Sequence, residues 1–139
     1  MTAPSSTTPL LDTHVWLWWL LGQPDLPTAE RAALDALMAA GRRPCVSAIS
    51  LWEAQMLWAK GRLQVDMPLA RWLPIAAEAV DVMPLALDVV LALDDLPARF
   101  HGDPADRIVV ATARAHGLAL ATHDGAIRRA RVARLWKAP

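Results

Sequence analysis

Short apolar runs and longer segments with apolar residues at helical spacing alternate along the chain. Four mostly apolar runs predict buried strands at residues 9–12, 44–47, 80–83 and 118–122. A further short strand is expected at residues 133–136. Runs without regular polar alternation are typical of strands that are covered on both faces, so a parallel sheet is expected.

Leucine, alanine and methionine recur at helical spacing between these runs. They predict helices at residues 13–21, 28–40, 50–60, 69–78, 86–93 and 103–116. Pro74, inside the fourth helix, is expected to kink or break it. The alternation of strands and helices predicts an α/β domain, with residues 9–139 as one unit and residues 1–8 as a flexible, small and polar start.

Composition narrows the class of protein. A length of 139 residues with 55% hydrophobic and 20% charged residues indicates one globular domain rather than a disordered or fibrous chain. The single cysteine, Cys45, excludes an intramolecular disulfide, and we expect it to be a buried apolar residue. The apolar run Val15–Leu21 is too short to span a membrane, so a soluble, cytoplasmic protein is expected.

The charge balance argues against binding of nucleic acid through bulk charge, since 14 basic residues face 14 acidic ones. The charge is unevenly distributed, however. The segment after Gly125 contains no acid and five basic residues: Arg128, Arg129, Arg131, Arg134 and Lys137. Two interpretations remain open for it, a solvated helix face and a contact surface for a phosphate backbone.

Four carboxylates stand where an open α/β sheet places its site, beyond the carboxyl ends of the strands. They are Asp12, Glu53, Asp106 and Asp124. Carboxylates that converge repel one another unless one holds a proton or a cation lies between them. Mg²⁺ prefers oxygen ligands, and a bound cation can activate water against a phosphodiester. The pattern therefore predicts a metal-dependent site.

Each carboxylate except Asp12 also has a local structural interpretation. Ser50 and Glu53 have the spacing of a capping box. Asp103 and Asp106 suit the first turn of a helix that begins with Pro104. Asp124 before Gly125 is a common turn sequence. Asp12 stands between two apolar runs and has little local purpose, so it is the strongest candidate for chemistry.

Four segments resemble, in the same order along the chain, the four motifs of PIN domains of the VapC toxin type. They are Leu10–Trp18, Val46–Glu53, His101–Ala113 and Ala121–Asp124. The resemblance spans nearly the whole chain. It implies a three-layer α/β/α sandwich whose short-stranded central sheet is mainly parallel. It also implies an endoribonuclease that needs Mg²⁺ or Mn²⁺ and leaves 5′-phosphate and 3′-hydroxyl ends.

The resemblance also implies roles and partners. The metal-binding quartet carries over onto Asp12, Glu53, Asp106 and Asp124, with Asp103 as a fifth ligand or only a helix cap. Thr122 matches an accessory hydroxyl of the fourth motif. The implied partners are an RNA substrate, a cognate antitoxin protein and a second copy of the chain.

Several further side chains have open roles. Arg107 is expected to contact a phosphate or to pair with a carboxylate, and Arg128, Arg129 and Arg131 are candidate RNA contacts. His123 is expected to be a solvent-facing turn residue rather than a metal ligand. His14 is assigned to packing at a helix start, and His101 to a loop.

Five of the seven tryptophans divide into two expected groups. Trp16, Trp19 and Trp52 have the spacing of a buried helix face. Trp18 and Trp58 are candidates for exposure, either toward a partner protein or for stacking on a nucleobase.

Three other classes compete with a nuclease. A haloacid-dehalogenase-like enzyme needs a second Asp two residues after the first, but position 14 is His. A receiver domain needs a lysine after a late strand, yet the lysines are Lys60 and Lys137 only. A catalytically silent PIN-like domain that only binds a partner is the third alternative, and the four intact carboxylates argue against it.

Overall fold

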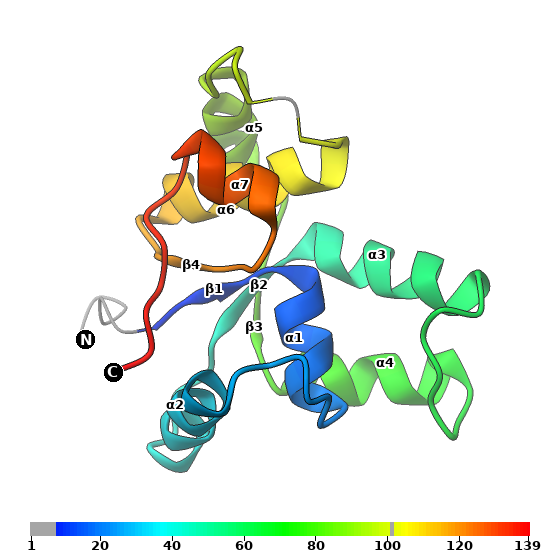
Figure 1. Ribbon diagram of the computed structural model, residues 1–139. Helices are drawn as coiled ribbons and strands as arrows, with labels where there is room; N and C mark the ends of the chain where they lie inside the picture. The colour runs from blue at the N-terminus through cyan, green and yellow to red at the C-terminus, as the bar shows by residue number, and fades with distance from the viewer. Residues whose placement is uncertain (1–7, 101) are drawn as a thin grey trace.

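The computed structural model describes residues 8–100 and 102–139. Its centre is a four-stranded parallel sheet in the order β3-β2-β1-β4 (Figure 1). The strands are β1 (Leu10–Leu11), β2 (Cys45–Ser47), β3 (Asp81–Met83) and β4 (Leu120–Ala121). Since all four run in one direction, their carboxyl ends meet at the same edge of the sheet.

Helices cover both faces of the sheet (Figure 1). One face carries α1 (Thr13–Leu20), α2 (Thr28–Ala39), α3 (Ala48–Ala59) and α4 (Leu69–Glu78). The other carries α5 (Leu87–Asp94), α6 (Pro104–His116) and α7 (Gly125–Ala130). The predicted three-layer α/β/α arrangement is therefore confirmed.

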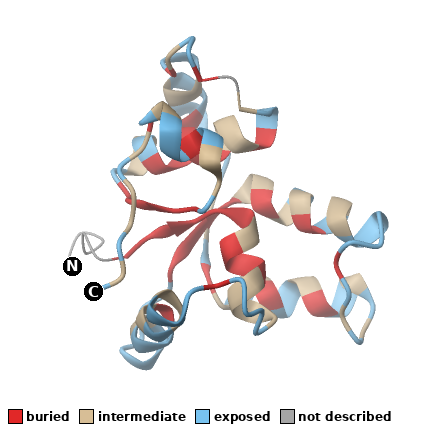
Figure 2. Ribbon diagram, in the orientation of Figure 1, coloured by how far each residue is buried: buried red, intermediate tan, exposed pale blue. Residues whose placement is uncertain are grey.

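Two hydrophobic cores follow from the alternation of side chains along the strands. Leu10 and Leu120 pack toward α5 and α6, whereas Leu11 and Ala121 pack toward α1, α3 and α4. All four are buried, and Figure 2 shows β1, β2 and β4 buried throughout, whereas the edge strand β3 is partly exposed. Truncating either leucine of β1 to alanine is expected to cost about 2–5 kcal/mol of stability.

The predicted elements agree with the structure to within a few residues at most boundaries. Pro74 does not break α4, which continues from Leu69 to Glu78. The predicted strand at residues 133–136 is reduced to one parallel bridge between Leu120 and Leu135. That bridge extends the sheet beyond β4, because Leu120 N donates to Arg134 O at 2.8 Å and Trp136 N donates to Leu120 O at 2.8 Å.

The capping box predicted at Ser50 and Glu53 is wrong. The helix α3 begins directly after β2, and its cap is Ser47, whose hydroxyl oxygen accepts from Ile49 N at 3.2 Å. No loop separates strand from helix, so the helix starts two residues earlier than the Ser50 pattern suggested. Both Ser50 and Glu53 are thereby free to face the end of β1.

The burial of the tryptophans differs from the prediction at one position. Trp16 is fully buried and Trp19 is half-buried, as expected of a helix face toward the core. Trp52, however, is 50% exposed. The buried stripe of α3 carries Ser50 and Ala54, and a residue between them points to the opposite side of the helix. Trp58 is exposed, as predicted.

Cys45 is buried in the core as predicted. Burial, with a smaller contribution from the charge of Asp81, raises the pKa of its thiol to about 11. A thiol of that pKa is unreactive. In the part of the chain that the structure describes, no helix is long and apolar enough to cross a membrane. The predicted flexible start lies outside the described residues except for Thr8, which is buried.

Candidate active site

Asp12 lies directly after β1 and is almost completely buried, with 1% of its surface exposed. It caps α1, because its Oδ1 accepts from Thr13 N at 2.8 Å. Its Oδ2 accepts from the Thr122 hydroxyl at 2.6 Å. The pairing of β1 with β4 brings these two residues together, since Asp12 N donates to Ala121 O at 2.9 Å. The carboxylate is thus held in one orientation.

Thr13 connects the start of α1 to α3. Its hydroxyl donates to Glu53 Oε1, and its oxygen lies 2.8 Å from the Ser50 hydroxyl oxygen. A hydroxyl has one proton, so Thr13 accepts from Ser50 while it donates to Glu53. This chain of hydrogen bonds fixes Glu53 beside Asp12.

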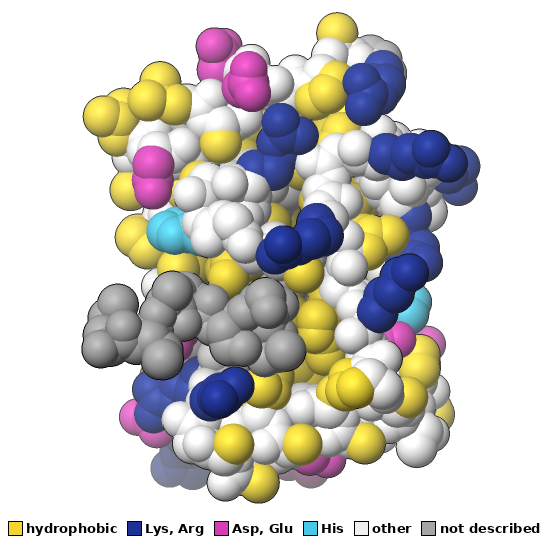
Figure 3. All heavy atoms as spheres, turned by 90° about the vertical axis from the view of Figure 1, so that its left-hand side faces the viewer, with side chains coloured by type: hydrophobic (Ala, Val, Ile, Leu, Met, Phe, Trp, Pro, Cys, Tyr) yellow, Lys and Arg dark blue, Asp and Glu magenta, His cyan; other side chains and the backbone are white. Residues whose placement is uncertain are grey.

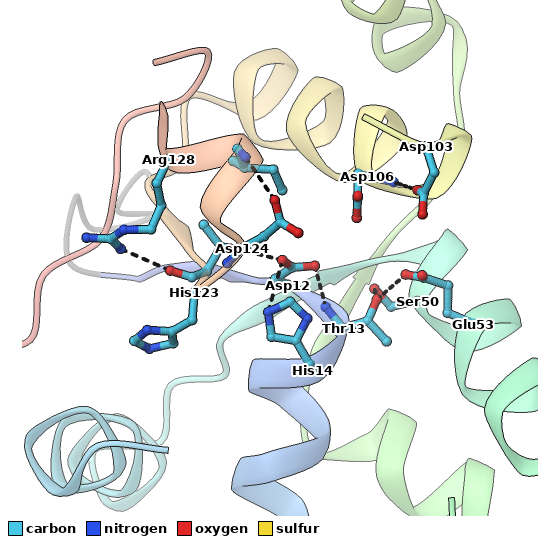
Figure 4. A network of polar contacts seen from close by, with 12 residues as sticks. Asp12, Thr13, His14, Ser50, Glu53, Asp103, Asp106, His123, Asp124 and Arg128 are labelled. Carbon is cyan, nitrogen blue, oxygen red and sulfur yellow. Dashed lines mark hydrogen bonds and ion pairs between the residues drawn. The ribbon is translucent and has the colours of Figure 1, made fainter. Parts of the chain in front are cut away.

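Asp103 and Asp106 lie at the start of α6. Asp103 is the N-cap, with Oδ1 accepting from Asp106 N at 2.8 Å, and Pro104 follows at the first helical position. These contacts agree with the interpretation of Asp103 as a helix cap. Asp106, one turn into the helix, points across toward the end of β1 (Figure 4).

Asp124 follows β4 and is the N-cap of α7. Its Oδ1 accepts from Ile127 N at 2.9 Å, and its own backbone N–H donates to the Thr122 hydroxyl oxygen at 3.0 Å. Thr122 is buried and bonds to both neighbours at once. One hydroxyl therefore couples the positions of Asp12 and Asp124.

The five carboxylates share one electrostatic environment. Burial first, and then the charges of Asp103, Asp12, Asp124 and Glu53, raise the pKa of Asp106 to about 7. Burial also raises the pKa of Glu53, against the lowering effect of its Thr13 hydrogen bond, and Asp12 and Asp103 raise it further. Figure 4 shows these side chains around one space between α6 and the end of β1. Negative charge is crowded there, and no Lys or Arg of the described residues forms an ion pair with these carboxylates.

The donor set fits a hard divalent cation such as Mg²⁺ or Mn²⁺. All the converging ligand atoms are carboxylate or hydroxyl oxygens, which Mg²⁺ prefers. Among the described residues, no three acidic, histidine or cysteine side chains are close enough together to form a ready-made chelate. Mg²⁺ keeps several of its waters and needs only one or two carboxylates, so this spacing suits it.

Two histidines flank the acidic side chains. His14 does more than pack at the helix start: its Nε2 is 3.4 Å from Asp12 Oδ2, and its ring lies against Trp18. His123 is exposed on the turn after β4, as predicted, and its Nε2 is 2.9 Å from Glu30 Oε1 on α2. The prediction for His101 lies outside the described residues.

The basic side chains divide into those near the site and those away from it. Arg128 donates to Thr122 O at 3.1 Å, and Arg129 lies over Gly125, where a Cβ would be 2.7 Å from its Nη1. Arg131 ends α7, whereas Arg134 donates to Gly117 O at 3.0 Å, at the far end of α6. Figure 3 shows basic side chains along the face formed by α7 and the C-terminal segment.

Arg107 forms no ion pair with a carboxylate in the described part of the chain, and its phosphate contact stays a prediction. Its Nη1 donates to Phe100 O at 2.7 Å, and its guanidinium lies 5.9 Å from the centre of the Phe100 ring. Arg107 therefore supports the segment that leads into Asp103.

Sequence reasoning missed Thr13 and Ser50 as members of the site. Thr13 follows Asp12 directly, and Ser50 precedes Glu53 by three residues, the spacing that places two side chains on one helix face. That spacing is the sequence signal for this role, although it also fits a helix cap. The structure shows that both hydroxyls orient Glu53 instead.

A parallel sheet between two helical layers, with carboxylates gathered at the carboxyl edge, agrees with the family comparison. A model of the PIN domain matches residues 10–133. The chain therefore belongs to the PIN-domain family.

A similar protein narrows the assignment within this family. The chain is 37% identical over 122 residues to Ribonuclease VapC22 of Mycobacterium tuberculosis (strain ATCC 25618 / H37Rv), which covers 88% of this chain and 91% of that protein. This similarity shows that it belongs to the VapC group of PIN domains. A crystal structure of VapBC2 from Rickettsia felis bound to a promoter DNA fragment has the same fold, with a TM-score of 0.67, 15% identity and coverage of 92% of this chain and 96% of that one.

Proposed function

We propose that this protein is a metal-dependent endoribonuclease and the toxin of a toxin–antitoxin pair. Its relative from Mycobacterium tuberculosis is named a ribonuclease, and the two chains align over 88% of this one. The observation that carries the proposal is the crowding of Asp12, Glu53, Asp103, Asp106 and Asp124, where burial first and then the neighbouring negative charges raise the pKa of Asp106 to about 7. Such crowding favours the binding of a divalent cation.

Mg²⁺ or Mn²⁺ would be held among Asp12, Glu53, Asp106 and Asp124, one or two of them binding it directly and the others through its waters, with Asp103 contributing charge from the helix start. A cation bound there supplies an activated water and neutralises charge on the phosphate. The protein's own part is positioning: Thr122 and the Thr13 N–H orient Asp12, while the Thr13 hydroxyl orients Glu53. Pre-orientation lowers the cost of assembling the site around substrate.

The substrate is a polyanion, so attraction has to come from outside the acidic centre. Arg128 lies against Thr122 O, and Arg129 and Arg131 follow on α7 and at its end. We assign phosphate contacts to these three residues. Lys and Arg that neutralise phosphates release counterions, which supports binding even by a protein of zero net charge.

Two exposed apolar surfaces suit the protein partners. On α5, Leu87 is 73% exposed and Leu91 is 62% exposed, and we assign this surface to a homodimer. A groove of about 660 Å³ between α3 and α4 is lined by Leu51, Leu69 and Leu73. We assign the groove to an antitoxin segment, because α3 also carries Glu53 and leads a bound chain to the site.

A cleavage assay on total RNA tests the proposed activity. We choose Asp106→Asn, since the Asp106 carboxylate accepts no hydrogen bond from the described residues, whereas Asn at position 12 would place an amide N–H₂ group against existing donors. Discrete fragments are expected from the wild type with Mg²⁺ and not with EDTA. Loss of one ligand is expected to slow cleavage about 10- to 100-fold or more.

The matched control is Asp94→Asn, the same change at an exposed position of α5. It is expected to cleave like the wild type. If folded, antitoxin-free protein cleaves no RNA with any divalent cation, the chain is instead a catalytically silent binding domain.

A further inference from the structure

Three ring side chains form a row that begins at the acidic site. His14 and Trp18 lie one turn apart on α1, with ring centroids 5.1 Å apart. The Trp18 ring is 5.9 Å from that of His123, which follows β4. The row starts at Asp12, whose Oδ2 is 3.4 Å from His14 Nε2, and ends one residue before Asp124. We call these three residues the ring row.

The ring row is accessible. The side chain of His14 is 36% exposed and that of His123 is 33% exposed, while Trp18 is half-buried. The rings are tilted by 53° and 39° to each other, so they do not stack in parallel. A planar group from outside the protein can therefore lie against them.

The ring row is also held in place from both ends. His123 is fixed by its 2.9 Å contact with Glu30 of α2, and His14 by Asp12. Trp18 packs at the edge of the core that α1 shares with the sheet. Rings that are already ordered lose little conformational entropy when a ligand binds, which favours affinity.

The other two tryptophans of α1 fill the core and connect α1 to α2, so Trp18 is not needed for either role. Trp16 is fully buried and fills the core. Trp19 donates from Nε1 to Asp35 Oδ1 at 2.9 Å and so connects α1 to α2. Trp18 is the tryptophan of α1 that lies against the two histidines of the site.

We propose that the ring row is a stacking surface for an unpaired nucleobase of single-stranded RNA, next to the phosphate that is cleaved. The inference rests on the proposed ribonuclease function. Single-stranded RNA is recognised largely by stacking of its bases on aromatic side chains and arginine. An acidic centre repels the RNA backbone, so an uncharged attraction beside it is needed. Arg128, fixed to Thr122 O beside His123, is placed to contact the neighbouring phosphate.

The test is binding of a short single-stranded RNA that contains 2-aminopurine, whose fluorescence falls when it stacks on a ring. Binding is measured with Mg²⁺ in the Asp106→Asn protein, so that the RNA stays intact. Trp18→Leu in this protein is expected to weaken binding about 5- to 100-fold and to restore the fluorescence. Trp18→Phe keeps a ring and is expected to retain most of both effects.

The matched control is Trp19→Leu, the same change at the next position of α1. It is expected to bind RNA as the parent does, and melting temperatures show whether each variant is folded. His123→Ala removes a ring that is exposed on a turn, so it tests the surface without disturbing the core. It is expected to weaken binding several-fold and to reduce the quenching.

The outcomes separate the two proposals. If the wild type cleaves RNA, but Trp18→Leu and His123→Ala bind RNA and lower the 2-aminopurine fluorescence as Trp19→Leu does, the proposed stacking surface is wrong. The ribonuclease function then stands. If the wild type neither cleaves nor binds RNA, both proposals fail. Weaker binding by Trp18→Leu and His123→Ala, with Trp19→Leu unchanged, supports the stacking surface.

Discussion

The Thr122 hydroxyl donates a 2.6 Å hydrogen bond to Oδ2 of Asp12, a residue 110 positions earlier in the chain. The same hydroxyl oxygen accepts from Asp124 N at 3.0 Å. Thr122 is buried, and so is Asp12. A single side chain thus connects the ends of β1 and β4 and sets the distance between two carboxylates of the site.

Thr122→Val should disrupt this connection with little change in volume. Asp12 Oδ2 would lose its hydroxyl donor, which is expected to cost about 1–3 kcal/mol in stability. Mn²⁺ affinity, measured by calorimetry, should fall about 10- to 100-fold, because supporting hydrogen bonds orient metal ligands. Thr122→Ser keeps the hydroxyl and should restore the affinity. Equal Mn²⁺ affinity in Thr122→Val and the wild type would show that Thr122 only stabilises the fold.

The raised pKa of Asp106 predicts how the stability of the metal-free protein depends on pH. Its pKa is raised from 3.8 to about 7 in the fold, so the folded state binds the proton more tightly than the unfolded state. Ionised Asp106 should therefore destabilise the folded protein above pH 7, and this penalty should shrink as the pH falls toward 4. At pH 8, Asp106→Asn should be more stable than the wild type, on the order of 1 kcal/mol because the side chain is half-exposed. Below about pH 4 the difference should vanish.

Denaturant titrations at pH 8 and pH 4 with EDTA measure this difference. Saturating Mn²⁺ should stabilise the wild type more than Asp106→Asn, since the cation neutralises the crowded charge. A variant that is less stable than the wild type at pH 8 with EDTA would contradict the electrostatic account.

Arg128 and Arg134 should differ in their effect on RNA binding. Each phosphate contact to single-stranded RNA contributes about 0.7 to the slope of log affinity against log salt concentration. Arg128→Gln should reduce the slope by about that amount, because this residue lies beside Thr122. Arg134→Gln, at the far end of α6 beside Gly117, should leave it unchanged. Equal slopes for Arg128→Gln and the wild type would remove Arg128 from the RNA contacts.

The proposed homodimer interface predicts that the oligomeric state depends on α5. Leu91→Glu places a charge on a side chain that is 62% exposed, so it should split the dimer without unfolding the protomer. Ile75→Glu, at a similarly exposed position of α4, is the control. Sedimentation velocity should give a monomer for the first and a dimer for the second. A dimer in both would place the interface elsewhere.

Much of the fold was predictable from the order of short apolar runs and helical segments. The strand ends also indicated the site, because Asp12 and Asp124 follow predicted strands and parallel strands meet at one edge. Two of the wrong predictions, the cap at Ser50 and the burial of Trp52, concern a helix start and a side-chain orientation. The capping box at Ser50 was misplaced because Ser47 ends the strand and caps the helix at once. Trp52 is exposed because it lies opposite the buried stripe of α3 that carries Ser50 and Ala54.

The partners of individual side chains could not be predicted, because they are brought together by packing of distant segments. The Thr13 bonds to Ser50 and Glu53 join residues 37 and 40 positions apart, and the contact of His123 with Glu30 spans 93. Equally, Arg134 belongs to the same basic segment as Arg128, yet it lies at the other end of α6.

The sequence by itself determined the α/β class, the order of the elements and the carboxylates at the strand ends, because local apolar patterns and strand direction dictate these features. Only the tertiary structure decided which hydroxyls orient the carboxylates, which arginine lies beside them and which tryptophan lies against the histidines. These are relations between segments far apart in the chain, and they depend on helix phase and on the packing of helices against the sheet.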